Sequence, residues 1–171
     1  MKKQKQTGIL NIGVLIIILL TLVGGGIYLS KNNSDTKKNT DSSDTSKKVV
    51  NLSNKGLTKA PEYIFDQSNI VELDLSDNSI DGALQSQIQK LQNLKVLNLS
   101  NNKFTGVPAE VGQLKKLEIL DLSNNQLTGL PNELGNLSNL KLLDLTGNNY
   151  SEADLTTIRK NLPSQTVIKT N

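Results

Sequence analysis

Cysteine and histidine are both absent from this chain of 171 residues, and its aromatic residues are three tyrosines and two phenylalanines. Without cysteine the chain forms no disulfide bond and offers no thiol for the acylation of a lipoprotein. Without cysteine and histidine it lacks thiolate and imidazole metal ligands. The sequence therefore excludes thiolate and imidazole metal sites. A calcium site between Asp74 and Asp77 is the alternative, but these residues lack a calcium-loop motif, so we predict no metal and no cofactor.

The net charge comes from the amino terminus. Three of the 19 basic residues, Lys2, Lys3 and Lys5, account for the formal charge of +3, because the other 16 balance the 16 acidic residues. No basic stripe with interleaved aromatic residues is present, and we predict no nucleic-acid partner.

The run from Ile9 to Leu29 is 21 residues long and has no charged side chain. As a helix it would measure about 31 Å, enough to cross a hydrocarbon core of ~30 Å. The lysines before it predict a cytoplasmic amino terminus. We therefore interpret residues 1–29 as a single-pass signal anchor in the cell membrane, with the following chain outside the cytoplasm. The alternative is a secreted protein whose signal peptide is cleaved near the small residues Gly24–Gly26.

Residues 30–48 contain no aliphatic or aromatic side chain. Such a segment buries too little apolar surface to offset the chain entropy lost on folding, so we expect a disordered linker. It would serve either as a flexible tether or as a spacer without contacts.

From Val49 onward the chain repeats itself. One unit, Leu117–Asn139, reads LEILDLSNNQLTGLPNELGNLSN. Aligning the units on one strand residue gives positions spaced 23, 24, 23 and 23 residues apart: Val50, Leu73, Leu97, Leu120 and Leu143. We call each unit a coil, and residues at the same position in successive coils a column. The pattern LxxLxLxxNxL resembles the leucine-rich repeat family.

The resemblance implies an α/β fold. We expect residues 49–171 to form a right-handed leucine-rich repeat solenoid of five coils, with a parallel sheet on its concave face and short helical turns on its convex face. Extracellular repeat proteins of animals usually have disulfide caps, so their absence favours the bacterial, membrane-anchored type of this family.

A polar column accompanies the leucines. It holds an asparagine in each coil after the first, and Lys55 in the first coil. Its members, here called the asparagine ladder, are Asn78, Asn102, Asn125 and Asn148. An inward side-chain amide there would form hydrogen bonds with buried backbone groups. Each such group, if left unpaired, would lower the stability of the fold by ~1–3 kcal/mol.

The segments between strands predict the convex turns and the carboxyl-terminal cap. In the second coil, residues 85–91 predict a slightly longer helix, which would hold the extra residue of the 24-residue step. Ser151 predicts an N-cap, and Leu155, Ile158 and Leu162 have helical spacing up to Pro163. Residues 166–169 predict a final strand, and Tyr63, Ile64 and Phe65 are the candidate cover at the looser amino-terminal end.

Three columns on the strands are predicted to face out from the concave side. The aliphatic column is Val49, Glu72, Val96, Ile119 and Leu142. The Asx column is Asn51, Asp74, Asn98, Asp121 and Asp144. The hydroxyl column is Ser53, Ser76, Ser100, Ser123 and Thr146. One interpretation is a groove for a basic and partly apolar peptide or protein, with an exposed patch at Val96, Ile119 and Leu142. The other is that L-D-L-S is only the repeat consensus.

The functional hypothesis is a membrane-anchored, extracytoplasmic module that binds an unknown protein or peptide through its concave face. The alternatives are a structural or adhesive role in the cell envelope and a ligand-binding sensor subunit that acts through a partner. Carboxylates on an open sheet, without a partner base, predict no enzyme. The sequence leaves the ligand and the oligomeric state open.

Overall fold

The computed structural model describes residues 46–171, which form the repeat domain. The predicted anchor and nearly all of the predicted linker lie outside the described residues. Between Ser46 and Asn171 no helix is long and apolar enough to cross a membrane.

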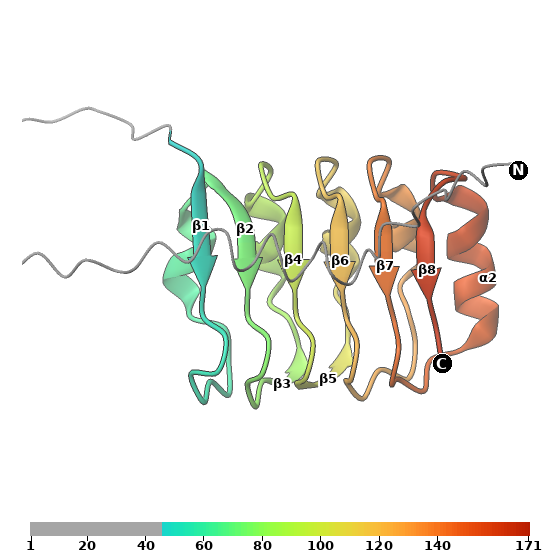
Figure 1. Ribbon diagram of the computed structural model, residues 1–171, viewed down its shortest axis with the longest axis horizontal. Helices are drawn as coiled ribbons and strands as arrows, with labels where there is room; N and C mark the ends of the chain where they lie inside the picture. Colours follow the sequence, from blue (N-terminus) through green and yellow to red (C-terminus); the bar gives the residue numbers. More distant parts are fainter. Residues whose placement is uncertain (1–45) are drawn as a thin grey trace, which may run out of the picture. The chain divides into compact units, whose positions relative to one another are not determined.

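Six parallel strands form the main sheet (Figure 1). In spatial order they are β1 (Lys48–Asn51), β2 (Ile70–Asp74), β4 (Val96–Asn98), β6 (Ile119–Asp121), β7 (Leu142–Asp144) and β8 (Val167–Lys169). Their register confirms the predicted alignment, because each member of the column Val50, Leu73, Leu97, Leu120 and Leu143 pairs with the next. The predicted final strand is confirmed as β8, in which Ile168 pairs with Leu143.

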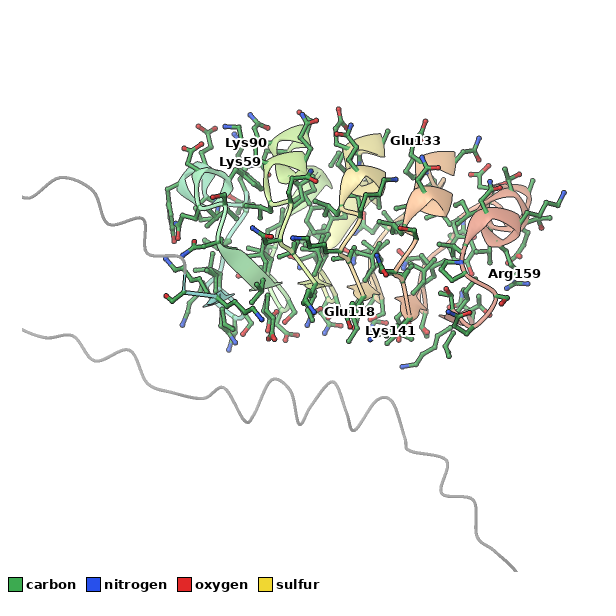
Figure 2. The ribbon with its side chains drawn as sticks, turned by 90° about the horizontal axis from the view of Figure 1, so that it is seen from above. Lys59, Lys90, Glu118, Glu133, Lys141 and Arg159 are labelled. Atoms are coloured by element: carbon green, nitrogen blue, oxygen red, sulfur yellow. The ribbon has the colours of Figure 1, made fainter. Side chains whose placement is uncertain are left out.

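Short 3-10 helices form the layer opposite the sheet, as Figure 2 shows from above. They are η1 (Glu62–Asp66), η2 (Ser86–Lys90), η3 (Ala109–Gln113) and η4 (Asn132–Asn136). Each follows an extended residue, which is proline before η1, η3 and η4 and Gln85 before η2. Proline suits this position for two reasons. Its fixed φ is compatible with an extended residue, and it has no backbone N–H that would need a hydrogen-bond acceptor.

The expectation of a longer helix in the second coil is wrong. η2 has five residues, like η1, η3 and η4. The extra residue lies earlier, because Ile80 and Leu84 are four positions apart whereas Phe104 and Val107 are three. Gly82 lies in this longer stretch and adopts a φ of 72°, which glycine tolerates without a steric penalty.

The same stretch forms a second sheet that the sequence did not predict. It consists of β3 (Asp81–Ala83) and β5 (Lys103–Gly106), paired in parallel with a register shift between Gly82 and Ala83. These strands join the sheet layer to the helical turns at the lower edge of the view in Figure 1.

The inward columns fill the space between the two layers. Leu73, Leu97, Leu120 and Leu143 are at most 1% exposed, and Phe104 is equally buried. Each coil buries its leucines against the coils on both sides, so the apolar core is continuous along the stack.

The two ends of the stack differ. At the carboxyl end, α2 (Glu152–Asn161) packs against η4, and Leu155 and Ile158 are buried. Ser151 is the N-cap, as predicted, and its Oγ accepts a hydrogen bond from the Asp154 amide at 3.4 Å. At the amino end Ile64 and Phe65 are buried, but Tyr63 is 58% exposed.

Candidate functional site

The asparagine ladder fulfils the predicted role of bonding to the backbone. In each ladder residue Oδ1 accepts an amide hydrogen bond from the preceding coil, and Nδ2 donates to carbonyls of both coils. For Asn125 the donor is the Phe104 amide at 3.0 Å, and the acceptors include the Leu99 and Leu122 carbonyls, each at 3.0 Å. Asn78, Asn102 and Asn148 repeat this pattern. The ladder therefore holds the fold and is not free for a ligand.

The Asx and hydroxyl columns bond to each other within each coil. Asp121 Oδ1 accepts hydrogen bonds from the Ser123 amide at 2.9 Å and from Ser123 Oγ at 2.7 Å. Asn98 with Ser100, and Asp144 with Thr146, make the same two bonds. These bonds fold each side chain against its own strand.

The prediction that both columns face solvent is wrong for several members. Asp74, Ser76, Asn98, Ser100 and Asp144 are all less than 9% exposed. Neighbouring coils flank each side chain on both sides, and the bond to the residue two positions on keeps it low against the sheet. By contrast, Asp121 and Ser123 are half-buried and Thr146 is exposed.

Charge on the Asx column is unevenly balanced. Asp144 Oδ2 forms an ion pair at 3.0 Å with Lys169 of β8, which the sequence did not place on this face. Burial raises the pKa of Asp121, although its bonds to Ser123 and the charge of Lys169 act in the opposite direction. Burial thus disfavours the ionised form of the Asp121 carboxyl.

The aliphatic column is the most apolar part of the face. Val96 and Ile119 are half-buried as neighbours on β4 and β6, but Leu142 is only 1% exposed, so its predicted exposure is wrong. β8 lies beyond Leu142, places Val167 beside it and extends the sheet by one strand.

Val167 completes the column and is 40% exposed, while Val49 at the opposite end is 38% exposed. Alternation in Val167–Lys169 is the sequence signal that could have placed Val167 on the outward face. Glu72 is the one polar member of the column, between Val49 and Val96 in the register, and burial raises the pKa of its carboxyl. The result is an apolar strip across all six strands, interrupted by one carboxyl.

A row of charges borders this strip. Glu118 accepts hydrogen bonds from Lys95 at 2.7 Å and from Lys141 at 2.6 Å, one coil away on each side. The bond to Lys141, followed by the bond to Lys95, lowers the pKa of Glu118. Figure 2 shows Glu118 and Lys141 together on the sheet side, away from Glu133 on the helical side.

The family model described as "Leucine-rich repeat region" matches residues 51–165. The chain belongs to this leucine-rich repeat family. The match covers the coils with their paired strands and asparagine ladder, and most of the carboxyl-terminal cap.

Among solved structures, a leucine-rich repeat protein of Leptospira interrogans is 43% identical, with a TM-score of 0.61 over 66% of this chain and 28% of that one. The plant peptide hormone receptor RGFR1, solved in complex with RGF2, is 34% identical, with a TM-score of 0.54 over 65% of this chain and 18% of that one.

Among curated proteins, Receptor-like protein 18 of Arabidopsis thaliana is 43% identical over 56 residues, which are 33% of this chain and 7% of that protein. The repeat chain thus spans a small part of these relatives. They share its leucine-rich repeat fold.

Proposed function

We propose that the chain is a membrane-anchored, extracytoplasmic repeat module that binds a protein or peptide through the concave face of its sheet. The observation that carries the proposal is the apolar strip formed by Val49, Val96, Ile119, Leu142 and Val167. Two of its members, Val49 and Val167, are among the three exposed large hydrophobic residues of the described domain. Aligned apolar side chains on a solvent-facing sheet are typical of contact surfaces.

The chemistry of the face selects an extended, partly apolar partner. Six strands at ~4.8 Å give a strip about 24 Å long, which matches about seven residues of extended peptide at ~3.3 Å each. Glu72 offers a carboxyl within the strip, so a basic residue of the partner would be placed beside Val96. The Asx and hydroxyl columns contribute less than their composition suggests, because their bonds are largely internal.

The size of the face limits affinity. Four residues per strand over six strands give a footprint of roughly 300 Å², whereas a standard interface covers roughly 800 Å² on each partner. Binding through this face alone would be weak. Attachment to a membrane would raise the effective concentration and offset part of this weakness.

The relatives support a protein or peptide partner and an extracytoplasmic location. RGFR1 is a peptide hormone receptor and Receptor-like protein 18 is receptor-like by name, so an extracytoplasmic binding role is the best-supported one. The anchor at residues 1–29, the linker at 30–48 and the bacterial origin stay predictions from the sequence.

Cross-linking on intact cells followed by mass spectrometry tests the proposal. We expect cross-linked peptides from one partner protein to map to the strip. The double variant Val96→Ser and Ile119→Ser should lose these cross-links, while Val107→Ser, a half-buried valine between β5 and η3, should keep them. Leu142 is left unchanged because it is buried, and its loss would destabilise the sheet.

Two results would contradict the proposal. One is equal cross-linking by the double variant and by Val107→Ser. The other is co-sedimentation of the chain with purified cell-wall polymer without any cross-linked protein, which would favour the structural envelope role.

A further inference from the structure

The carboxyl-terminal end of the stack contains a hollow of about 320 Å³. Ile168 pairs with Leu143 and so occupies the column of inward leucines, at the position where another coil would stack. α2 covers the helical side of this end, and the hollow lies between α2 and β8. Its lining residues are Arg159, Leu162, Pro163, Ser164, Thr166 and Ile168.

Arg159 gives this hollow a chemistry that no other place in the chain has. It is the only arginine in the sequence. The domain's lysines Lys59, Lys90, Lys95, Lys141 and Lys169 pair with carboxylates. The side chain of Arg159 has no ion pair and no hydrogen bond to another residue among residues 46–171, a property that it shares with the side chains of Lys55, Lys103 and Lys160. Figure 2 shows it on α2, at the end of the stack.

The rest of the lining combines apolar surface with hydroxyl groups. Leu162 is only 7% exposed, and Pro163 and Ile168 are half-buried. Thr166 Oγ1 donates to the Leu140 carbonyl at 2.7 Å, which fixes its position and leaves its oxygen free to accept. Ser164 is exposed, and its hydroxyl makes only a long contact of 3.4 Å with Gln165.

We propose that this hollow, here called the cap pocket, binds the free carboxyl terminus of a peptide whose last residue is aliphatic. A guanidinium presents two parallel N–H donors that match the two oxygens of a carboxylate. The Ser164 hydroxyl supplies a further donor, and the surface of Leu162, Pro163 and Ile168 accepts the aliphatic side chain. A volume of about 320 Å³ accommodates one or two residues and not a folded domain.

The apolar lining distinguishes this ligand from an inorganic anion. Phosphate would satisfy Arg159 and Ser164 but would leave Leu162 and Ile168 in contact with water. The pocket is separate from the apolar strip, so its function does not depend on binding at the concave face.

Nuclear magnetic resonance titration of the isotope-labelled full chain tests the cap pocket. The probe is acetyl-glycyl-leucine with a free carboxylate, compared with its carboxyl-terminal amide and with inorganic phosphate. We expect saturable shifts at Arg159 and residues 162–168, with the amide and phosphate each binding at least about tenfold more weakly.

Matched variants complete the test. Arg159→Gln should weaken binding of the free-acid probe by at least about tenfold. Arg159→Lys should weaken this binding less, because an ammonium keeps the charge but loses the paired donors. Lys160→Gln removes the same charge from the next position of α2 and should leave binding unchanged. The proposal is overturned if the free acid gives no shifts in the pocket, if acid and amide bind equally, or if Arg159→Gln binds like Lys160→Gln.

Discussion

The amide of Phe104 donates a hydrogen bond at 3.0 Å to Oδ1 of Asn125, which belongs to the next coil. Nδ2 of the Asn125 side chain donates to the Leu99 carbonyl of the preceding coil and to the Leu122 carbonyl of its own coil. One buried amide therefore joins two coils through backbone groups alone. Its geometry depends on no neighbouring side chain, which explains why the position holds asparagine in four successive coils.

Replacing Asn125 with alanine should lower the free energy of unfolding by roughly 2–4 kcal/mol, because buried amide and carbonyl groups lose their partner. Urea denaturation measures this change. Gln126→Ala is the control, since Gln126 is an exposed amide at the next position and should change stability by less than about 0.5 kcal/mol. Equal effects of the two variants would contradict the bonding role of the ladder.

Gly112→Ala should destabilise the convex layer. A Cβ at Gly112 would lie 2.1 Å from the Glu133 carbonyl oxygen of the following coil, so the turns could not remain this close. We expect a loss of about 1–3 kcal/mol, as for overpacked interiors. Gly106→Ala is the matched control, because nothing lies within 4 Å of the position that its added methyl group would take. Thermal melts of both variants check the difference, and an unchanged Gly112→Ala melt would refute the close contact.

Asp121→Asn should stabilise the domain at neutral pH by less than about 1 kcal/mol. Burial raises the pKa of Asp121 above its ordinary value of 3.8, so ionisation opposes folding at pH values above the raised pKa. Asn98 shows that asparagine makes the same bonds to the residue two positions on. The gain should shrink as the pH falls through the raised pKa.

The control for Asp121 is Asp144→Asn. It has the same chemistry in the next coil, but it breaks the ion pair with Lys169 and should give no gain. Denaturation curves at pH 7 and pH 3 compare the two variants. A loss of stability in Asp121→Asn at pH 7 would show that its charge is needed.

Glu118→Gln should cost about 0.5–1 kcal/mol at neutral pH and low salt, because the side chain is 27% exposed and surface ion pairs are screened by water. The bonds to Lys141 and Lys95 lower the pKa of Glu118 below 4.5. The stabilisation is therefore complete above pH 4.5 and is lost as the pH falls through the lower folded value. Urea denaturation measures the change, with Glu133→Gln on the opposite layer as the control, because Glu133 forms no ion pair among residues 46–171 and its replacement should change stability by less than about 0.5 kcal/mol.

The features predicted from sequence are those that side-chain periodicity controls. Leu73, Leu97 and Leu120 recur because each fills the same place in the core, so their spacing predicts the register of the strands. The pairing of β3 with β5 was missed because it joins backbone groups around Gly82 and leaves no apolar pattern. The burial of Asp74 was missed because its Oδ1 accepts a hydrogen bond from the Ser76 amide, at 2.9 Å, that composition does not reveal.

The third, fourth and fifth coils share one register, and bonds within the stack join each coil only to its immediate neighbours. A duplicated copy of Leu117–Asn139 would thus find the same ladder, the same turn and the same pair of neighbours that the original has. Gene duplication can therefore lengthen the sheet by one strand at a time, with the terminal helix carried outward unchanged.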